Sequence, residues 1–89
     1  MRAEDMLPDH LNQVDLDGTK VRKGTIGAFL VNAGVFLDPS VTAASREEAG
    51  MHIAEALPAL SALGLFEVMA VRSPVLQAFM AQYPAGPRS

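Results

Sequence analysis

The first regular pattern along the chain is an alternation of apolar and polar side chains that begins at about residue 12. It leads into Asp17-Gly18, a pair typical of two-residue hairpin turns, whose central positions need positive φ. The pattern predicts two short antiparallel strands, residues 12–16 and 19–22. Because an isolated hairpin is marginally stable in water, these strands would need a helix or a third strand to cover them.

Apolar side chains at helical spacing then dominate residues 25–37, where Asn32 is the one strongly polar residue. Thr25 is predicted to cap the start of this helix. A helix that is apolar on every side is normally buried all round, which in a small domain indicates a central helix, an oligomer contact, or both. Gly27 and Gly34 lie seven residues apart on nearly one face, where another backbone could approach closely. Alternatively, Gly34 ends the helix in a left-handed cap.

A second helix is predicted after the helix-breaking Asp38-Pro39 pair. The segment "SREE" matches a capping box, with Ser45 as N-cap and Glu48 reaching back to it. Pro58 interrupts the apolar stripe that follows and predicts a kink or a restart. Gly64 stands where a C-terminal cap is expected.

Residues 65–71, "LFEVMAV", form a short run rich in apolar and β-branched side chains. The length of the run favours a buried strand that joins the hairpin in a three-stranded sheet, because periodicity alone does not separate a short strand from a helix segment. Ser73-Pro74 then provides an N-cap and a first-turn proline for a last helix that ends at Tyr83.

These elements follow the order β-β-α-α-β-α and predict a small single α+β domain. Residues 1–11 are interpreted as a loose N-terminal arm, residues 12–83 as the domain, and residues 84–89 as a disordered tail. No internal repeat and no linker divides the chain.

Composition suggests where the domain could make contacts. Of the 89 residues 49% are apolar and only 19% are charged, below the roughly 25% usual for soluble domains. A domain this small has a thin core, so part of the apolar surplus is expected in a self-interface or in a groove for another protein. We predict a homodimer formed by the apolar faces of the first and last helices. The predicted interface residues are Phe29, Phe36, Phe79 and Met80.

Charge and cysteine content exclude several classes of function. The net charge is -3, whereas nucleic-acid binding depends on a basic surface. The chain contains no Cys, which excludes disulfides, thiolate nucleophiles and cysteine-ligated zinc. The start "MRAEDMLPDH" lacks the pattern of a signal peptide, and no apolar run reaches the ~20 residues that span a bilayer. A cytoplasmic protein with no membrane partner is predicted.

A basic segment precedes the first predicted helix and forms the one candidate ligand site. Lys20, Arg22 and Lys23 lie close to Thr25, and the free N–H groups of a helix start can bind anions. The spacing matches neither a P-loop nor a dinucleotide-binding fingerprint. The simpler interpretation is that these cations are the solvent side of an edge strand, where lysines discourage further pairing.

Other chemistry finds little support in the sequence. Glu48, His52 and Glu55 share one helix face, but a di-iron site needs a second such set and carboxylates from four helices. An ordinary solvated face is the better interpretation. With two His and scattered Ser, no nucleophile and base can be paired. We expect no metal, no cofactor and no enzymatic activity.

Two segments carry a resemblance, "DGTKVRKGTIGAFLVN" from Asp17 and "ALPALSALGLFEV" further along the chain. Together they cover about a third of the sequence and resemble segments of a group of small uncharacterised bacterial proteins that share a DGTKV-x-x-GTIGA-like motif. The resemblance implies a compact bacterial domain that stands alone as a short polypeptide. It implies no activity, ligand or site residue.

Overall fold

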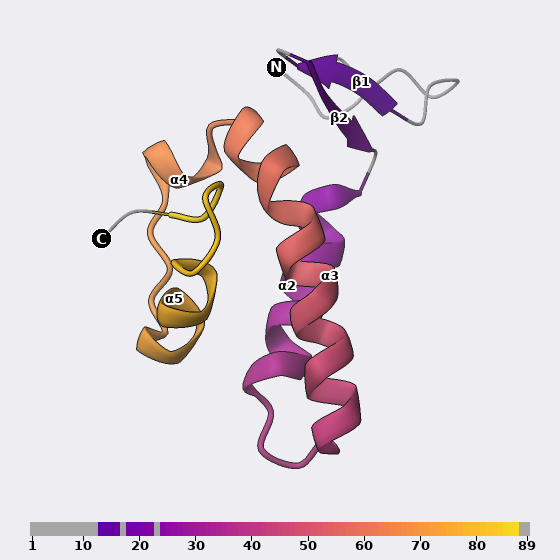
Figure 1. Ribbon diagram of the computed structural model, residues 1–89, viewed down its shortest axis with the longest axis vertical. Coiled ribbons are helices and arrows are strands. Elements are labelled where there is room, and N and C mark those ends of the chain that lie inside the picture. Colours follow the sequence, from indigo (N-terminus) through magenta and orange to yellow (C-terminus); the bar gives the residue numbers. More distant parts are fainter. Residues whose placement is uncertain (1–12, 17, 23, 88–89) are drawn as a thin grey trace.

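The computed structural model describes residues 13–16, 18–22 and 24–87 of the chain. The predicted arm at residues 1–11 lies outside this part. The described elements are mostly helical (Figure 1). They are, in chain order, β1 (Gln13–Leu16), β2 (Thr19–Arg22), α2 (Thr25–Leu37), α3 (Ala43–Ala62), α4 (Leu65–Val68) and α5 (Pro74–Met80).

The predicted α+β fold with a three-stranded sheet is wrong. Within the described residues the only sheet is the two-stranded ribbon of β1 and β2, in which Gln13 pairs with Arg22 and Leu16 with Thr19. Residues 65–71 add no third strand to it. Gly64 takes a left-handed conformation, with φ of 80°, and the chain then forms the single helical turn of α4 before it becomes extended at Met69. The apolar run is used to cover helices rather than to extend a sheet.

Helices α2 and α3 form an antiparallel hairpin, and α4 and α5 lie along one side of it (Figure 1). The strand β2 contacts α3. The core lies where α2, α3 and α5 meet. Its buried members are Phe29, Ala33, Ile53, Leu57, Leu60, Leu76 and Met80. Half-buried side chains of α4 and the segment after it, among them Leu65, Phe66 and Val71, pack against this core. The hairpin therefore supplies most of the core, and the segment after it seals one side.

Both main helices begin differently from the prediction. The N-cap of α2 is Gly24 at φ 85°, and Thr25 is the first helical residue, whose hydroxyl donates to the Arg22 carbonyl at 2.6 Å. The N-cap of α3 is Thr42, whose Oγ1 accepts from the Ser45 N–H at 3.1 Å. Ser45 is therefore inside the helix, and the capping box with Glu48 is not formed. The two alanines that follow Thr42 have high helix propensity, which favours the earlier start.

Two possible breaks inside the helices do not occur. Gly34 does not end α2, which continues to Leu37 and is capped by Asp38 in an extended conformation. Pro58 does not end α3, which continues to Ala62. Proline costs about 3 kcal/mol in a helix interior, but three buried side chains near it, Leu57, Ala59 and Leu60, give α3 a compensating gain from burial.

The start of the last helix is as predicted, since Ser73 Oγ accepts from the Leu76 N–H at 3.2 Å and Pro74 occupies the first turn. The helix ends at Met80 rather than at Tyr83. Residues 84–87, predicted as part of a disordered tail, form turns in which Ala85 packs against the core.

The turn between α2 and α3 contains a carboxylate with a lowered pKa. The Ser40 hydroxyl and backbone N–H donate to Asp38 Oδ1 at 2.7 and 2.8 Å, and these bonds, with the positive charge of Arg46, hold the pKa of Asp38 below its usual value. Arg46 also donates to the Asp38 carbonyl at 3.2 Å. These contacts join the end of α2 to the first turns of α3.

Asp38→Asn is expected to lower the melting temperature at neutral pH. The pKa of Asp38 is lower in the folded protein than in the unfolded chain. The ionised Asp38 carboxylate therefore stabilises the fold at pH values above the ordinary aspartate pKa of about 3.9. This stabilisation is lost as the pH falls through the folded-state pKa. The difference in melting temperature between wild type and variant should therefore shrink in acid. Thermal denaturation from pH 7 to pH 2 followed by circular dichroism measures it, and a difference that stays constant would contradict the assignment.

Candidate functional site

An apolar groove runs along α2 on the side where α4 and the segment before α5 lie. Its volume is about 410 Å³. Of its residues only Arg72 and Ser73 have polar side chains. The apolar lining consists of Ile26, Phe29, Leu30, Ala33, Leu37, Leu65, Phe66, Met69, Ala70, Val71 and Leu76. The floor is formed by buried core residues, and the walls come from the outer side of α2 and from residues around α4.

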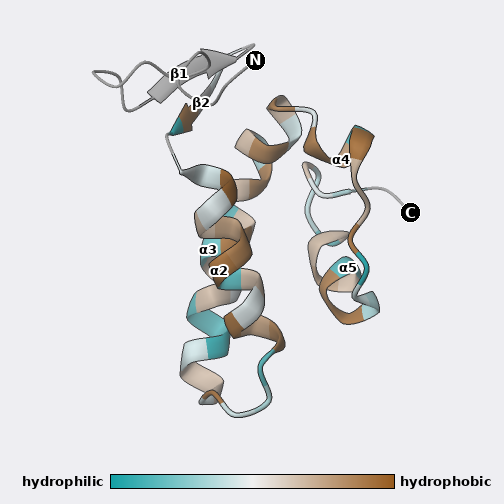
Figure 2. Ribbon diagram, turned by 180° about the vertical axis from the view of Figure 1, so that it is seen from behind, coloured by the Kyte–Doolittle hydropathy of each residue, from teal (hydrophilic) through white to brown (hydrophobic). Residues whose placement is uncertain are grey.

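Large apolar side chains remain exposed on α2 and at α4, among them Leu30 and Met69, which line the groove. Leu30 and Val31 on α2 are 62% and 68% exposed, and Val68 and Met69 are 86% and 62% exposed. Hydrophobic colours recur along α2 and α4 (Figure 2). Throughout its length α2 contains no charged residue. We call this region the α2 face and define it by Ile26, Leu30, Val31, Leu37, Val68 and Met69, all exposed.

The predicted interface residues do not lie on this face as exposed side chains. Phe29 and Met80 are buried in the core, so the prediction that they contact a partner is corrected by their burial. Phe36 and Phe79 are half-buried and their rings are in contact, tilted by 40° with centroids 4.6 Å apart. Gly50 lets this pair approach α3, because a Cβ there would lie 3.1 Å from the Phe79 ring. These aromatic residues hold the helices of one chain together.

The sequence contained one signal for the exposed residues that were missed. The helix 25–37 is apolar on all sides, so some of its apolar side chains had to face outwards, but the pattern does not say which. Leu30 directly follows the buried Phe29 in the sequence, and only tertiary packing determines that one side chain is exposed and the other buried. Met69 was missed because residues 65–71 were interpreted as a buried strand.

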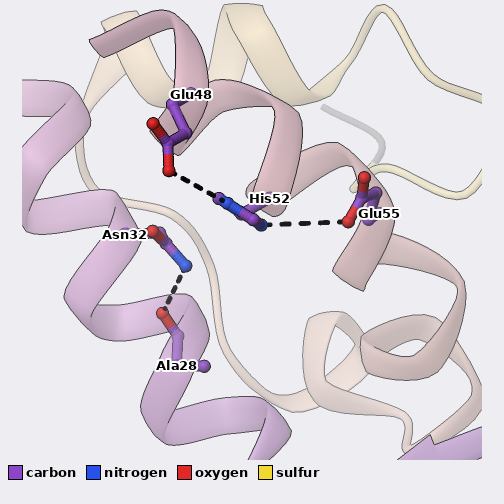
Figure 3. A network of polar contacts seen from close by, with 5 residues as sticks. All are labelled: Ala28, Asn32, Glu48, His52 and Glu55. Carbon is purple, nitrogen blue, oxygen red and sulfur yellow. Dashed lines mark hydrogen bonds and ion pairs between the residues drawn. The ribbon is translucent and has the colours of Figure 1, made fainter. Parts of the chain in front are cut away.

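The predicted anion site is only partly assembled in the described part of the chain. Arg22, Gly24 and Thr25 line a cavity of about 580 Å³ together with Asn32, His52 and Glu55, among others. Lys23 and the side chain of Lys20 lie outside the described residues. The Thr25 hydroxyl is used in its bond to the Arg22 carbonyl, and Asn32 Nδ2 donates to the Ala28 carbonyl at 3.0 Å (Figure 3). Because a Glu55 carboxylate lines the same cavity, its charge opposes an anion.

On α3, His52 lies between two carboxylates (Figure 3). Its Nε2 is 3.6 Å from a Glu48 oxygen and its Nδ1 is 3.8 Å from a Glu55 oxygen. All three side chains are at least half exposed. Among the described residues no group of three His, Cys, Asp or Glu side chains is arranged to hold a metal ion. The arrangement is that of neighbouring charges on a solvated helix face.

Within residues 13–16, 18–22 and 24–87, no helix combines the length and the apolar character needed to cross a membrane. No protein-family model matches the chain, and no curated protein or solved structure is significantly similar to it. The resemblance to small bacterial proteins therefore stays a prediction.

Proposed function

We propose that this protein is a small non-enzymatic interaction module that self-associates through the α2 face. The observation that carries the proposal is the apolar groove of about 410 Å³, continuous with exposed Leu30 and bordered by a helix without charged residues. Exposed apolar surface of this kind marks protein contacts in small domains. A second copy is the occupant that the surface suits, because α2 itself has no charged residue and brings no like charges together when it meets the α2 of another copy.

The size of the α2 face supports this choice. Six of the nine large apolar side chains that are exposed in the described residues belong to it. At their exposed fractions these six side chains offer on the order of 700 Å², close to the ~800 Å² per partner that a standard interface buries. That area is about a ninth of the total accessible surface of 6302 Å². If fully covered, these six residues would supply most of the area that a standard dimer interface buries on each partner.

The alternative of a small anionic-ligand protein receives less support. Its cavity combines Arg22 with Glu55, and the Thr25 hydroxyl is already bonded within the chain. No polar side chain in the described residues is buried without a hydrogen-bond partner, as one held ready for a ligand would be. We therefore propose no ligand for this cavity.

Leu30→Glu is expected to convert the dimer into a folded monomer. Leu30 is 62% exposed, so a charged side chain can be solvated in the single chain but would be buried without a partner in the dimer. We expect the dissociation constant to rise by at least about 100-fold, which corresponds to about 2.7 kcal/mol. Light scattering behind size exclusion measures the mass, and circular dichroism verifies the fold.

Met51→Glu is the matched control for this variant. Met51 is an apolar residue with a similar exposed fraction, 58%, but it lies on α3 and lines a different cavity, away from the α2 face. The Met51→Glu substitution introduces the same charge as Leu30→Glu and should leave the dimer intact. A monomeric wild type, or a dimer that Met51→Glu disrupts and Leu30→Glu does not, would contradict the proposal.

A further inference from the structure

Two glycines of α2, one in its first turn and one in its last turns, make no packing contact that requires glycine within the single chain. Gly27 and Gly34 are exposed, and a Cβ added to either would have no neighbouring atom within 4 Å. Neither has the positive φ that requires glycine, which occurs at Gly18, Gly24 and Gly64. Glycine destabilises a helix interior more than any residue except proline. Both positions therefore lower the stability of α2 without any gain in packing inside the chain.

The two glycines lie in the middle of the exposed side of α2. Because they are seven residues apart, they are two turns apart and differ by only about 20° around the helix axis. Between them in sequence are Leu30 and Val31, which project on either side of the line that joins the glycines. Leu30 is on the side of the apolar groove. The result is a shallow backbone channel with a large apolar side chain on each flank.

Resting on the proposed function, we infer that α2 of a second copy packs antiparallel in this channel, across a two-fold axis that passes beside Leu30 and Val31. A two-fold axis midway between residues 27 and 34 brings Gly27 opposite the partner's Gly34. It also places Leu30 next to the partner's Leu30, and Val31 next to the partner's Val31. Such an isologous contact uses the same patch on both copies and closes after two chains. The absence of side chains at the glycines lets the two helix backbones come close, as small residues do where helices cross in membrane proteins.

This arrangement also accounts for the groove. With Leu30 of each copy at the axis, the two grooves lie on the same side and become continuous across it. Ile26 and Leu37, which are partly exposed at the ends of the groove wall, face each other in the antiparallel pair. The exposed apolar side chains of α2 are then covered by their own equivalents.

Val31→Cys tests the position of the axis. The chain has no cysteine, so any disulfide must join the introduced residues of two copies. Since a disulfide needs Cα atoms closer than about 7 Å, only positions beside the axis cross-link to themselves. Under mild oxidation Val31→Cys should form a covalent dimer at least about 10-fold faster than Ser61→Cys, an exposed control position on α3. Rates are read from non-reducing gels.

Gly34→Leu tests the close approach. Nothing inside the chain meets the added side chain, and leucine favours the helix, so the single chain should melt at a higher temperature. The dissociation constant of the dimer should nevertheless rise at least about 10-fold, because the leucine side chain would clash with the partner's backbone. Ala44→Leu, exposed on α3, should change neither dimerisation nor folding by a comparable amount.

The outcomes separate this inference from the proposed function. A wild-type dimer that is unaffected by Gly34→Leu and does not cross-link at Val31→Cys would overturn the α2 pairing but leave self-association standing. A monomeric wild type would overturn both. Cross-linking at Val31→Cys together with a weakened Gly34→Leu dimer is the result expected here.

Discussion

Phe29→Asp is expected to unfold the protein. The Phe29 side chain is only 7% exposed and lies edge-on to Phe66, with ring centroids 6.5 Å apart. Truncating a buried phenylalanine costs about 3–5 kcal/mol, and placing a carboxylate in its position adds the cost of burying a charge without a partner. Because the free energy of unfolding of a whole domain is about 5–15 kcal/mol, this single substitution is expected to remove most of it.

The neighbouring position supplies the control for this variant. Leu30→Glu adds the same charge one residue further along α2, on the exposed side, and should leave the helical circular dichroism signal unchanged. Far-ultraviolet circular dichroism of both variants at 25 °C gives the comparison. A folded Phe29→Asp variant would mean that the Phe29 side chain can reach solvent, and the assignment of the inner and outer sides of α2 would then be wrong.

Leu57→Ala is expected to lower the free energy of unfolding by about 2–5 kcal/mol, the range for leucine truncation in well-packed cores. Leu57 has no exposed surface and lies in the core cluster with Ile53 and Leu60 on α3. The neighbouring side chains belong to three helices, so they cannot collapse into the space without shifting the helices. Urea denaturation measures the change.

Met51→Ala on the same helix is the corresponding control. Its side chain is largely exposed, so its truncation should cost less than about 1 kcal/mol. Equal losses for Met51→Ala and Leu57→Ala would indicate that α3 packs against the rest of the chain with a different side from the one described.

Local chemistry in the sequence was sufficient to predict some elements. Residues 25–37 were predicted as a helix and form α2, although Thr25 is its first residue and Gly24, not Thr25, is its N-cap. Ser73-Pro74 begins α5 because the serine hydroxyl and the proline φ favour a helix start independently of tertiary contacts. These features depend on neighbours within one turn of the chain.

The third strand was predicted wrongly because a short apolar run has no local feature that decides between strand and helix. In residues 65–71 the decision depends on Gly64, whose left-handed conformation redirects the chain along the side of α2 and α3. Leu65 and Phe66 then reach the core from a single helical turn. The strand would have needed a free edge of the hairpin beside it, and the path of α3 leads the chain elsewhere.

The sequence indicated that an apolar interaction surface exists but not which residues form it. Composition and the uniformly apolar helix indicated an interface, but the large aromatic residues chosen for it are used inside the chain. The rings of Phe36 and Phe79 contact each other and lie against Gly50. Leu30 and Val31, less conspicuous in the sequence, face outwards because α3 and α5 pack against other sides of α2. Which side is left uncovered is a property of the packed structure.

If a second copy covers the α2 face, nuclear Overhauser effects should be observed between the two chains at that face. In a sample that mixes ¹³C-labelled and unlabelled protein, a filtered experiment detects only contacts between two copies. Such contacts are expected from the methyl groups of Leu30 and Val31 to their equivalents in the partner. Contacts confined to Met51 and Tyr83, or none at all at millimolar concentration, would contradict it.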